Sequence, residues 1–363
     1  MSRSVVIYNE FFDTAGGGER SCLAFAKGFE ELGFKAHLVS NGSNKISLET
    51  LSRRFSIFPG TTDTILYMET EEEIRNFINE KNPDIFLNHS FGSTMNAPIE
   101  NSHYMAMFPK NNLNFNKNFL STYKVFICNS RFTERYLKRY WGGHLKTMVI
   151  IPPVISNLES KSNSAGKIKK DLNILLVGRF DLDGHNKCQL EAISSFRELV
   201  KQPKFSNWKL TLIGSLLDSS TSAQYLEACK LEATGLNVEF ILDADFLTLE
   251  NAYRESSFLW QCTGMHLPAG FHPELCEHLG LVSIDALTYG CIPIIYQRSG
   301  AAEELYFGVN CFFFSDKKEL LEITSVLSDL CHEQDVRFRH TLQKSSVQFS
   351  FDNFVKKLES ILS

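Results

Sequence analysis

The sequence has no pair of cysteines spaced as C-x-x-C, although nine cysteines occur among its 363 residues. Structural zinc sites and thioredoxin-like sites use such closely spaced pairs, and disulfide frameworks use an even, patterned set. An odd number of singly scattered cysteines is typical of reduced thiols in a cytosol. We therefore expect a cytoplasmic protein that has neither a disulfide framework nor a zinc site.

Long apolar runs and an excess of positive charge are also missing. No stretch reaches the roughly 18 apolar residues of a membrane-spanning helix, and the start, MSRSVVIYNEFF, lacks the apolar core and cleavage site of a signal peptide. The formal net charge of −5 argues against a general nucleic-acid binder. An apolar content of 43% and a charged content of 22% fit a folded globular protein.

What the sequence does contain is an alternation of short β-rich runs with amphipathic helical patterns. It extends over residues 1–155 and starts again over residues 171–345, as is typical of parallel α/β layers. A polar stretch rich in Ser, Lys and Asn interrupts it, so we predict a linker at 156–170. Residues 346–363 close the chain as an amphipathic helix. The sequence thus predicts two α/β domains in tandem, each with a buried parallel sheet.

Turns between a strand and a helix are the first places to look for a site, because open α/β sheets bind ligands at the carboxyl ends of their strands. Gly16, Gly17 and Gly18 follow the first strand, and a helix opens near Glu19. Such glycines let backbone amides approach an anion at a helix N-terminus. The spacing does not match the dinucleotide fingerprint G-x-G-x-x-G, and a flexible turn is the alternative interpretation.

The first turn of the second domain carries two cations, Arg179 and Lys187. An arginine fork and a lysine point charge suit a phosphate together, although basic residues in a loop are usually just solvated. Asp-x-Asp patterns at 181–183 and 243–245 resemble the signature of metal-dependent sugar transfer. Aspartates two residues apart are also common in turns. Since the two cations would already neutralise a phosphate, we expect no metal there.

Two acids frame the stretch CEHLGLVSIDALTYGCIPII, namely Glu277 and Asp285. The segment LVSIDALTY predicts a helix with Gly290 just past its end, and Gly280 lies at its start. An acid near a helix N-terminus offsets the macrodipole, which suffices for Glu277. Asp285 lies in a mostly apolar helix, so its carboxylate must face a cleft or a buried partner.

Together these segments resemble the retaining glycosyltransferases of family 4, which have the GT-B fold. The motifs are GGGER for the glycine loop, GRFDLDGHNKCQ for the donor-phosphate loop and LWQCTGMHLPAGFHPELCEHLGLVSIDALTYGCIPII for the nucleotide-sugar motif. The resemblance covers nearly the whole chain. It implies two Rossmann-like α/β/α domains facing across a cleft, the first for the acceptor and the second for the donor. It also implies that the C-terminal helix crosses back to the first domain.

The resemblance implies catalytic roles for three residues. Arg179 and Lys187 would stabilise the diphosphate leaving group, and Glu277 would contact hydroxyls of the transferred sugar. The reaction would need neither a metal nor a cofactor. Retention would follow from a front-face displacement, in which the leaving phosphate helps to deprotonate the acceptor hydroxyl.

Donor-binding roles carry over to five further residues. Asp285 would hold the ribose hydroxyls, and backbone amides around Gly280 and Leu281 would meet the sugar and phosphate. Gly16 and Gly17 would let the N-terminal loop close on the diphosphate and the acceptor.

The sequence departs from the family at three positions. Asp285 replaces a glutamate, Ser299 replaces the first residue of a Gly-Gly turn, and Met107 stands where many members have a histidine. His103 does not align with that histidine, and His89 is as readily a hydrogen-bonded core residue as a cleft residue. We assign neither a catalytic role.

We therefore expect an enzyme that moves a hexose from a GDP- or UDP-sugar to a glycan or lipid-linked acceptor, in cell-surface polysaccharide or glycolipid synthesis. Alternatives are a catalytically weak nucleotide-sugar binding module, motivated by the three departures, and a nucleotide-sugar epimerase. A two-domain NAD enzyme fits the α/β tandem but not the glycine spacing.

The segment RFTERYLKRYW predicts a helix with aromatic residues on one side and basic residues on the other. It could lie on the inner face of a membrane and reach a lipid-linked acceptor. The interpretation that we favour is a domain helix with its aromatic side packed inward.

Overall fold

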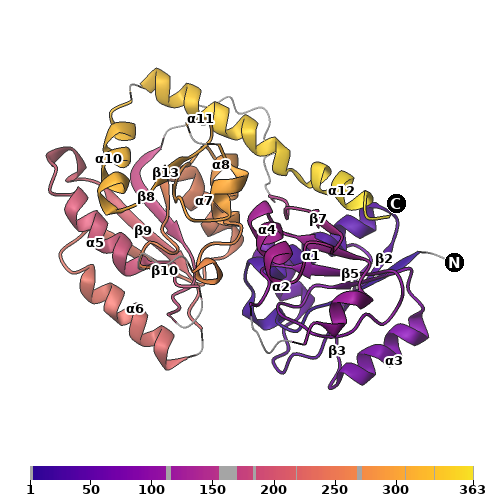
Figure 1. The fold of residues 1–363 in the computed structure, drawn as a ribbon. Helices are drawn as coiled ribbons and strands as arrows, with labels where there is room; N and C mark the ends of the chain where they lie inside the picture. The colour runs from indigo at the N-terminus through magenta and orange to yellow at the C-terminus, as the bar shows by residue number, and fades with distance from the viewer. Residues whose placement is uncertain are drawn as a thin grey trace. The chain divides into compact units, whose positions relative to one another are not determined.

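The computed structural model describes residues 3–111, 116–154, 170–182, 185–217, 219–267, 272–306, 308–330 and 332–362. The chain divides into two compact units, residues 1–155 with 349–363 and residues 156–348 (Figure 1). The linker predicted at 156–170 lies outside the described residues except for Lys170. Among the described residues, no helix combines the length and the apolar character needed to cross a bilayer.

The first unit contains a seven-stranded parallel sheet in the order β3-β2-β1-β4-β5-β6-β7. Its strands are β1 (Ser4–Tyr8), β2 (Lys35–Ser40), β3 (Ile65–Tyr67), β4 (Ile85–Asn88), β5 (Ser102–Ala106), β6 (Val125–Cys128) and β7 (Thr147–Val149). Its helices are α1 (Gly17–Glu31), α2 (Leu48–Phe55), α3 (Glu71–Lys81), α4 (Arg131–Tyr140) and α12 (Phe351–Glu359). Apart from Ser4 at the start of β1, the central strands β1, β4 and β5 are buried along their length, as expected for a sheet covered on both faces.

The second unit contains a six-stranded parallel sheet in the order β10-β9-β8-β11-β12-β13. Its strands are β8 (Asp171–Val177), β9 (Lys209–Gly214), β10 (Val238–Leu242), β11 (Ser256–Gln261), β12 (Ile292–Tyr296) and β13 (Phe312–Phe314). Its helices are α5 (Gln189–Leu199), α6 (Ser220–Glu232), α7 (Phe246–Glu255), α8 (Leu281–Thr288), α9 (Ala301–Glu304), α10 (Lys317–Ser328) and α11 (His332–Ser346). Both sheets therefore have the strand order of a Rossmann fold.

The C-terminal helix belongs to the first unit, although the chain reaches it from the second. Phe354 and Leu358 are buried in the same core cluster as α1, and the ring of Phe354 meets that of Phe25 edge-on at 5.1 Å. Gly28 of α1 allows this approach, because a Cβ atom there would lie 2.8 Å from both side chains. The helix predicted at 346–363 is shorter than expected, since Ser350 caps a new helix by accepting a hydrogen bond from Asn353.

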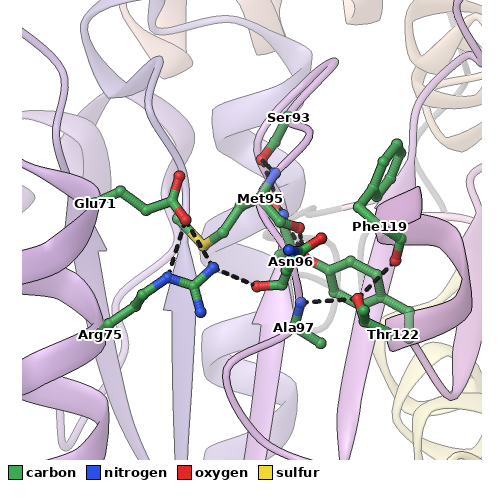
Figure 2. Close-up of polar contacts among 10 residues, drawn as sticks. Glu71, Arg75, Ser93, Met95, Asn96, Ala97, Phe119 and Thr122 are labelled. Atoms are coloured by element: carbon green, nitrogen blue, oxygen red, sulfur yellow. Dashed lines mark hydrogen bonds and ion pairs between the residues drawn. The ribbon is translucent and has the colours of Figure 1, made fainter. Parts of the chain in front are cut away.

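Polar contacts fix the connection between β4 and β5 in the first unit (Figure 2). Arg75 of α3 bonds the Glu71 carboxylate one turn away at 2.7 Å and donates to the carbonyl of Asn96 at 2.9 Å. The hydroxyl of Thr122 accepts the N–H of Ala97 at 2.9 Å. The bonds to Asn96 and Ala97 satisfy backbone groups of the loop, and the ion pair with Glu71 holds the Arg75 side chain.

The aromatic side of α4 faces the interior, in agreement with the interpretation that we favoured from the sequence. Phe132, Tyr136, Leu137 and Trp141 are buried in the first unit, while the basic residues between them are exposed. The aromatic face is therefore part of the protein core.

Candidate functional site

In the second sheet, the direction in which successive strands are added reverses between β8 and β11. One loop begins at the carboxyl end of each of these two strands. Arg179 follows β8 in one loop, which ends at α5, and the segment after β11 leads through Glu277 to α8. Because β8 and β11 are parallel neighbours, their carboxyl ends lie at the same edge of the sheet. This is the switch point where α/β sheets bind ligands.

Lys187 and Glu277 meet at this edge. The Lys187 ammonium lies 2.6 Å from Oε2 of Glu277, and both side chains are largely buried, with 18% and 14% exposed. Thr263, in the loop after β11, donates its hydroxyl to the same oxygen at 3.4 Å. The two predicted catalytic residues therefore form an ion pair, which the sequence interpretation did not foresee.

The ion pair decides the charge state of Glu277. Burial by itself raises the pKa of this carboxyl, but the Lys187 ammonium and the neighbouring His185 lower it to about 2. Glu277 is therefore an anion at neutral pH and can accept hydrogen bonds from hydroxyl groups of a ligand.

Two histidines that the sequence did not single out lie beside this pair. The rings of His185 and His278 meet edge-on with centroids 4.3 Å apart, and His185 also bonds the carbonyl of Glu274 at 2.9 Å. Burial and nearby Lys187 hold the pKa of His185 below its ordinary value, with Arg179 acting in the same direction. Both rings are thus neutral near pH 7, since burial and His185 also hold the pKa of His278 well below its usual range.

Gly280 adopts a left-handed conformation, with a φ of 78°, as the N-cap of α8. A Cβ atom there would lie 2.8 Å from Cβ of Ala301. Leu281 is the first helical residue, so its amide belongs to a helix N-terminus, where an anion is favoured. Gly290 follows the helix with a φ of 64°, as predicted.

Asp285 lies in the second turn of α8 and is buried, with 6% of its surface exposed. Ser299, in the segment that packs against the start of α8, is also buried, and its hydroxyl has no hydrogen-bond partner among the described residues. The two departures from the family thus lie at buried positions of the donor motif rather than at its surface.

In the first unit, Gly16 is the N-cap of α1 and Gly17 its first residue, so the helix begins two residues before the predicted start. The Glu19 carboxylate accepts the N–H of Gly16 at 2.8 Å and the Thr14 hydroxyl at 2.6 Å. The turn is consequently an ordered cap, in which one amide at the helix N-terminus already bonds an acid of the chain itself.

Met107 lies against this cap. A Cβ atom on Gly18 would be 3.2 Å from Cε of Met107, and the Met107 carbonyl accepts the Thr133 hydroxyl at 2.9 Å. A thioether therefore stands beside the glycine turn where many members of the resembled family have an imidazole.

His89 and His103 are core residues of the first unit. Both are fully buried, and Nε2 of His89 lies 3.1 Å from the hydroxyl of Ser21 on α1. Burial lowers the pKa of His89 to about 3 and that of His103 to about 4. Neither ring takes up a proton at neutral pH, which agrees with giving neither a catalytic role.

The low pKa of His89 predicts acid sensitivity. The unfolded chain binds a proton on this ring below about pH 6.5 but the folded chain only below about pH 3, so the free energy of unfolding decreases as the pH falls through this window. Between about pH 7 and pH 5 the free energy of unfolding should therefore decrease by about 2 kcal/mol less in His89→Gln than in the wild type. Urea unfolding at both pH values measures this, with exposed His144→Gln as the control. An unchanged pH dependence in His89→Gln would contradict the prediction.

In the Asp-x-Asp pattern at 243–245, the second aspartate has a local structural role. Asp245 caps α7 by accepting the N–H of Thr248 at 2.8 Å. In the pattern at 181–183, the last aspartate lies outside the described residues.

Comparison with known proteins places these features in a family. A model described as Glycosyltransferase Family 4 matches residues 15–156, and one described as Glycosyl transferases group 1 matches residues 158–343, which is more than half of the chain.

Two curated relatives match parts of the chain. Glycogen synthase of Chlamydia abortus is 25% identical over 138 residues, which cover 37% of this chain and 27% of that protein. GDP-Man:Man(3)GlcNAc(2)-PP-Dol alpha-1,2-mannosyltransferase of Yarrowia lipolytica is 24% identical over 189 residues, which cover 48% of this chain and 27% of that protein. The matches thus span about a quarter of the length of these relatives.

The fold is shared with solved structures. HepE of Anabaena, solved in complex with UDP, superimposes with a TM-score of 0.70 at 16% identity, covering 99% of each chain. The glycosyltransferase from Rickettsia africae has a TM-score of 0.71 at 14% identity, covering 99% of this chain and 98% of that one. These likenesses establish the fold.

Proposed function

Because the chain belongs to the glycosyl transferases group 1 family and has the GT-B fold, we propose that it is a retaining glycosyltransferase. It moves a hexose from a UDP- or GDP-sugar to a glycan or lipid-linked acceptor in cell-surface polysaccharide or glycolipid synthesis. The observation that carries the proposal is the Lys187–Glu277 pair at the switch point of the second sheet.

In this proposal Lys187 serves two partners. An ammonium has three N–H donors, so one can bond Glu277 while the others take oxygens of the diphosphate. Arg179 adds its fixed positive fork from the same loop, and the N-terminus of α8 adds backbone donors. The charge that develops on the leaving diphosphate is thus neutralised by groups of the protein, and the proposed reaction needs no metal.

The proposed bond changes occur on one face of the sugar. The bond between C1 and the phosphate oxygen breaks, and the acceptor oxygen bonds C1 from the same side. The proton of the acceptor hydroxyl passes to the departing phosphate. Glu277 holds sugar hydroxyls, and Asp285 holds the ribose of the nucleotide.

The proposed contact with a lipid-linked acceptor involves the surface of α4. Because the aromatic face of α4 is buried, contact with an anionic membrane would use its exposed basic face, which carries Lys138 and Arg139.

A panel of UDP-, GDP-, ADP- and dTDP-sugars tests the donor class. We expect one nucleotide to raise the melting temperature of the protein, because a ligand at about 100 times its Kd adds roughly 2.7 kcal/mol to the native state. Incubation with that donor and candidate acceptors then measures transfer, and NMR of the product gives the anomeric configuration. Binding without transfer or donor hydrolysis would favour the weak binding module, for which Met107 beside Gly18 is the motivating contact. An absence of any shift would contradict both.

A further inference from the structure

Three side chains that could ligate a metal converge in the second unit, next to Lys187 but outside the proposed reaction. They are Cys188, Glu191 and His266, and one ligand atom from each lies within 4.8 Å of the other two. Cys188 and Glu191 come from the start of α5, and His266 comes from the loop after β11. Although the cysteine spacing alone predicted no zinc site, we propose that these three residues form a binding site for Zn²⁺.

The cysteine and the histidine already face each other. Sγ of Cys188 lies 3.0 Å from Nδ1 of His266. Two such atoms on one tetrahedral zinc ion are about 3.6 Å apart, given Zn–S and Zn–N bonds of about 2.3 and 2.1 Å. An increase of roughly half an ångström in the distance between Sγ of Cys188 and Nδ1 of His266 would therefore admit the ion.

Glu191 supplies the third ligand. A glutamate at this helix position commonly bonds the N–H of the N-cap residue, but the N–H of Cys188 instead donates to Oδ1 of Asn186 at 2.7 Å. Oε2 of Glu191 is buried and has no hydrogen-bond partner within the described part of the chain. Its carboxylate is therefore available to a cation, and as an i, i+3 neighbour it shares a helix face with Cys188.

The backbone at Cys188 is a second, independent sign of function. Its φ of 59° and ψ of 42° lie in the left-handed region, which glycine occupies without strain. A strained residue of this kind persists where the surrounding structure holds it, and such residues gather at ligand sites. Here the residue in this conformation is buried, and its sulfur lies 3.0 Å from Nδ1 of His266.

The chemistry of the three ligands favours zinc. Thiolate, imidazole and carboxylate are the ligand types that Zn²⁺ uses, and three protein ligands leave the fourth position for water. Binding releases the thiol proton of Cys188 and forms the sulfur–zinc bond. His266 is exposed, so the ion can enter from solvent on its side.

The ion would tie together the two segments that hold Glu277. Lys187 immediately precedes Cys188, and Thr263 lies three residues before His266; both bond Oε2 of Glu277. We therefore expect zinc to change the affinity for the donor. This consequence rests on the proposed function, whereas the metal site itself does not.

Co²⁺ reports metal binding at Cys188 directly, because thiolate-bound Co²⁺ gives a charge-transfer absorption band. The chelator-treated full-length protein is titrated with Co²⁺ and then with Zn²⁺. We expect one equivalent of Co²⁺ to produce the band and Zn²⁺ to abolish it. Cys188→Gly should lose the band and still fold, because the relief of the left-handed backbone offsets part of the cost of removing a buried side chain. Glu191→Gln and His266→Gln should weaken binding by at least about tenfold.

Matched variants separate this site from adventitious binding. Glu198→Gln, on the same helix and 41% exposed, and His340→Gln, exposed on α11, should bind Co²⁺ as the wild type does. The inference is overturned if the wild type shows no band, or if Cys188→Gly keeps it. Because the band requires no sugar donor, the site can stand when the proposed transferase activity fails, and the reverse also holds.

Discussion

Replacing Lys187 by methionine is expected to lower kcat for sugar transfer by about 10²–10³-fold, the usual cost of removing one preorganised charge donor from a reaction centre. The substitution removes the positive charge proposed to bind the diphosphate. It also leaves Glu277 largely buried without its ion-pair partner. Release of the nucleoside diphosphate, measured in a coupled assay, reports the loss.

The same variant gives a second readout through Glu277. In the wild type its pKa of about 2 lies below the ordinary carboxyl value, so the ion pair stabilises the fold above about pH 4.5 and this contribution is lost as the pH falls towards 2. Without Lys187 we expect the pKa of Glu277 to rise and this acid-dependent loss to shrink. Breaking such a pair typically costs about 3–5 kcal/mol.

The matched control for this variant is Lys201→Met, two residues after the end of α5, where the lysine is 66% exposed and pairs with the Glu198 carboxylate at 2.7 Å. It should change neither kcat nor stability measurably, because exposed pairs contribute little. Lys187→Met with a kcat within about tenfold of the wild type would remove Lys187 from the proposed mechanism.

Gly300→Ala is expected to disrupt the segment that holds Glu277 and His278 without removing any charged group. A Cβ atom at this position would lie 1.8 Å from the carbonyl oxygen of His278 and 2.3 Å from its carbon, and both are backbone atoms. The N–H of Gly300 also donates to the carbonyl of Glu277 at 2.6 Å. The segments around Glu277 and Gly300 must therefore separate, and overpacking of this kind costs about 1–3 kcal/mol.

We expect Gly300→Ala to lower both the melting temperature and the donor-induced rise in it, because Glu277 and Gly280 lose their packing support. Differential scanning fluorimetry with and without the donor measures the two effects separately. Gly143→Ala is the control, since a Cβ atom there meets nothing within 4 Å. A Gly300→Ala protein with wild-type stability and donor response would show that the loop adapts freely.

The sequence predicted those features that depend on local pattern. Alternation of strand and helix patterns predicted the two α/β sheets, and the GT-B fold that the motifs implied is confirmed. The helix around Asp285, with Gly280 before it and Gly290 after it, also follows from residue type, because only glycine adopts these left-handed positions without strain.

Contacts between distant residues did not follow from the sequence. Lys187 and Glu277 are 90 residues apart and each had a predicted role, yet their ion pair depends on two loops reaching the same edge of the sheet. The same holds for His185 and His278, which carry no motif of their own.

By itself, then, the sequence determined the fold class and indicated candidate segments for the site, because periodicity, glycine positions and motif spacing are local properties. Only the tertiary structure decided the charge state of Glu277, the neutral core position of His89 and the meeting of Cys188 with His266. Burial and pairing set these properties, and both arise from residues that chain folding brings together across many positions.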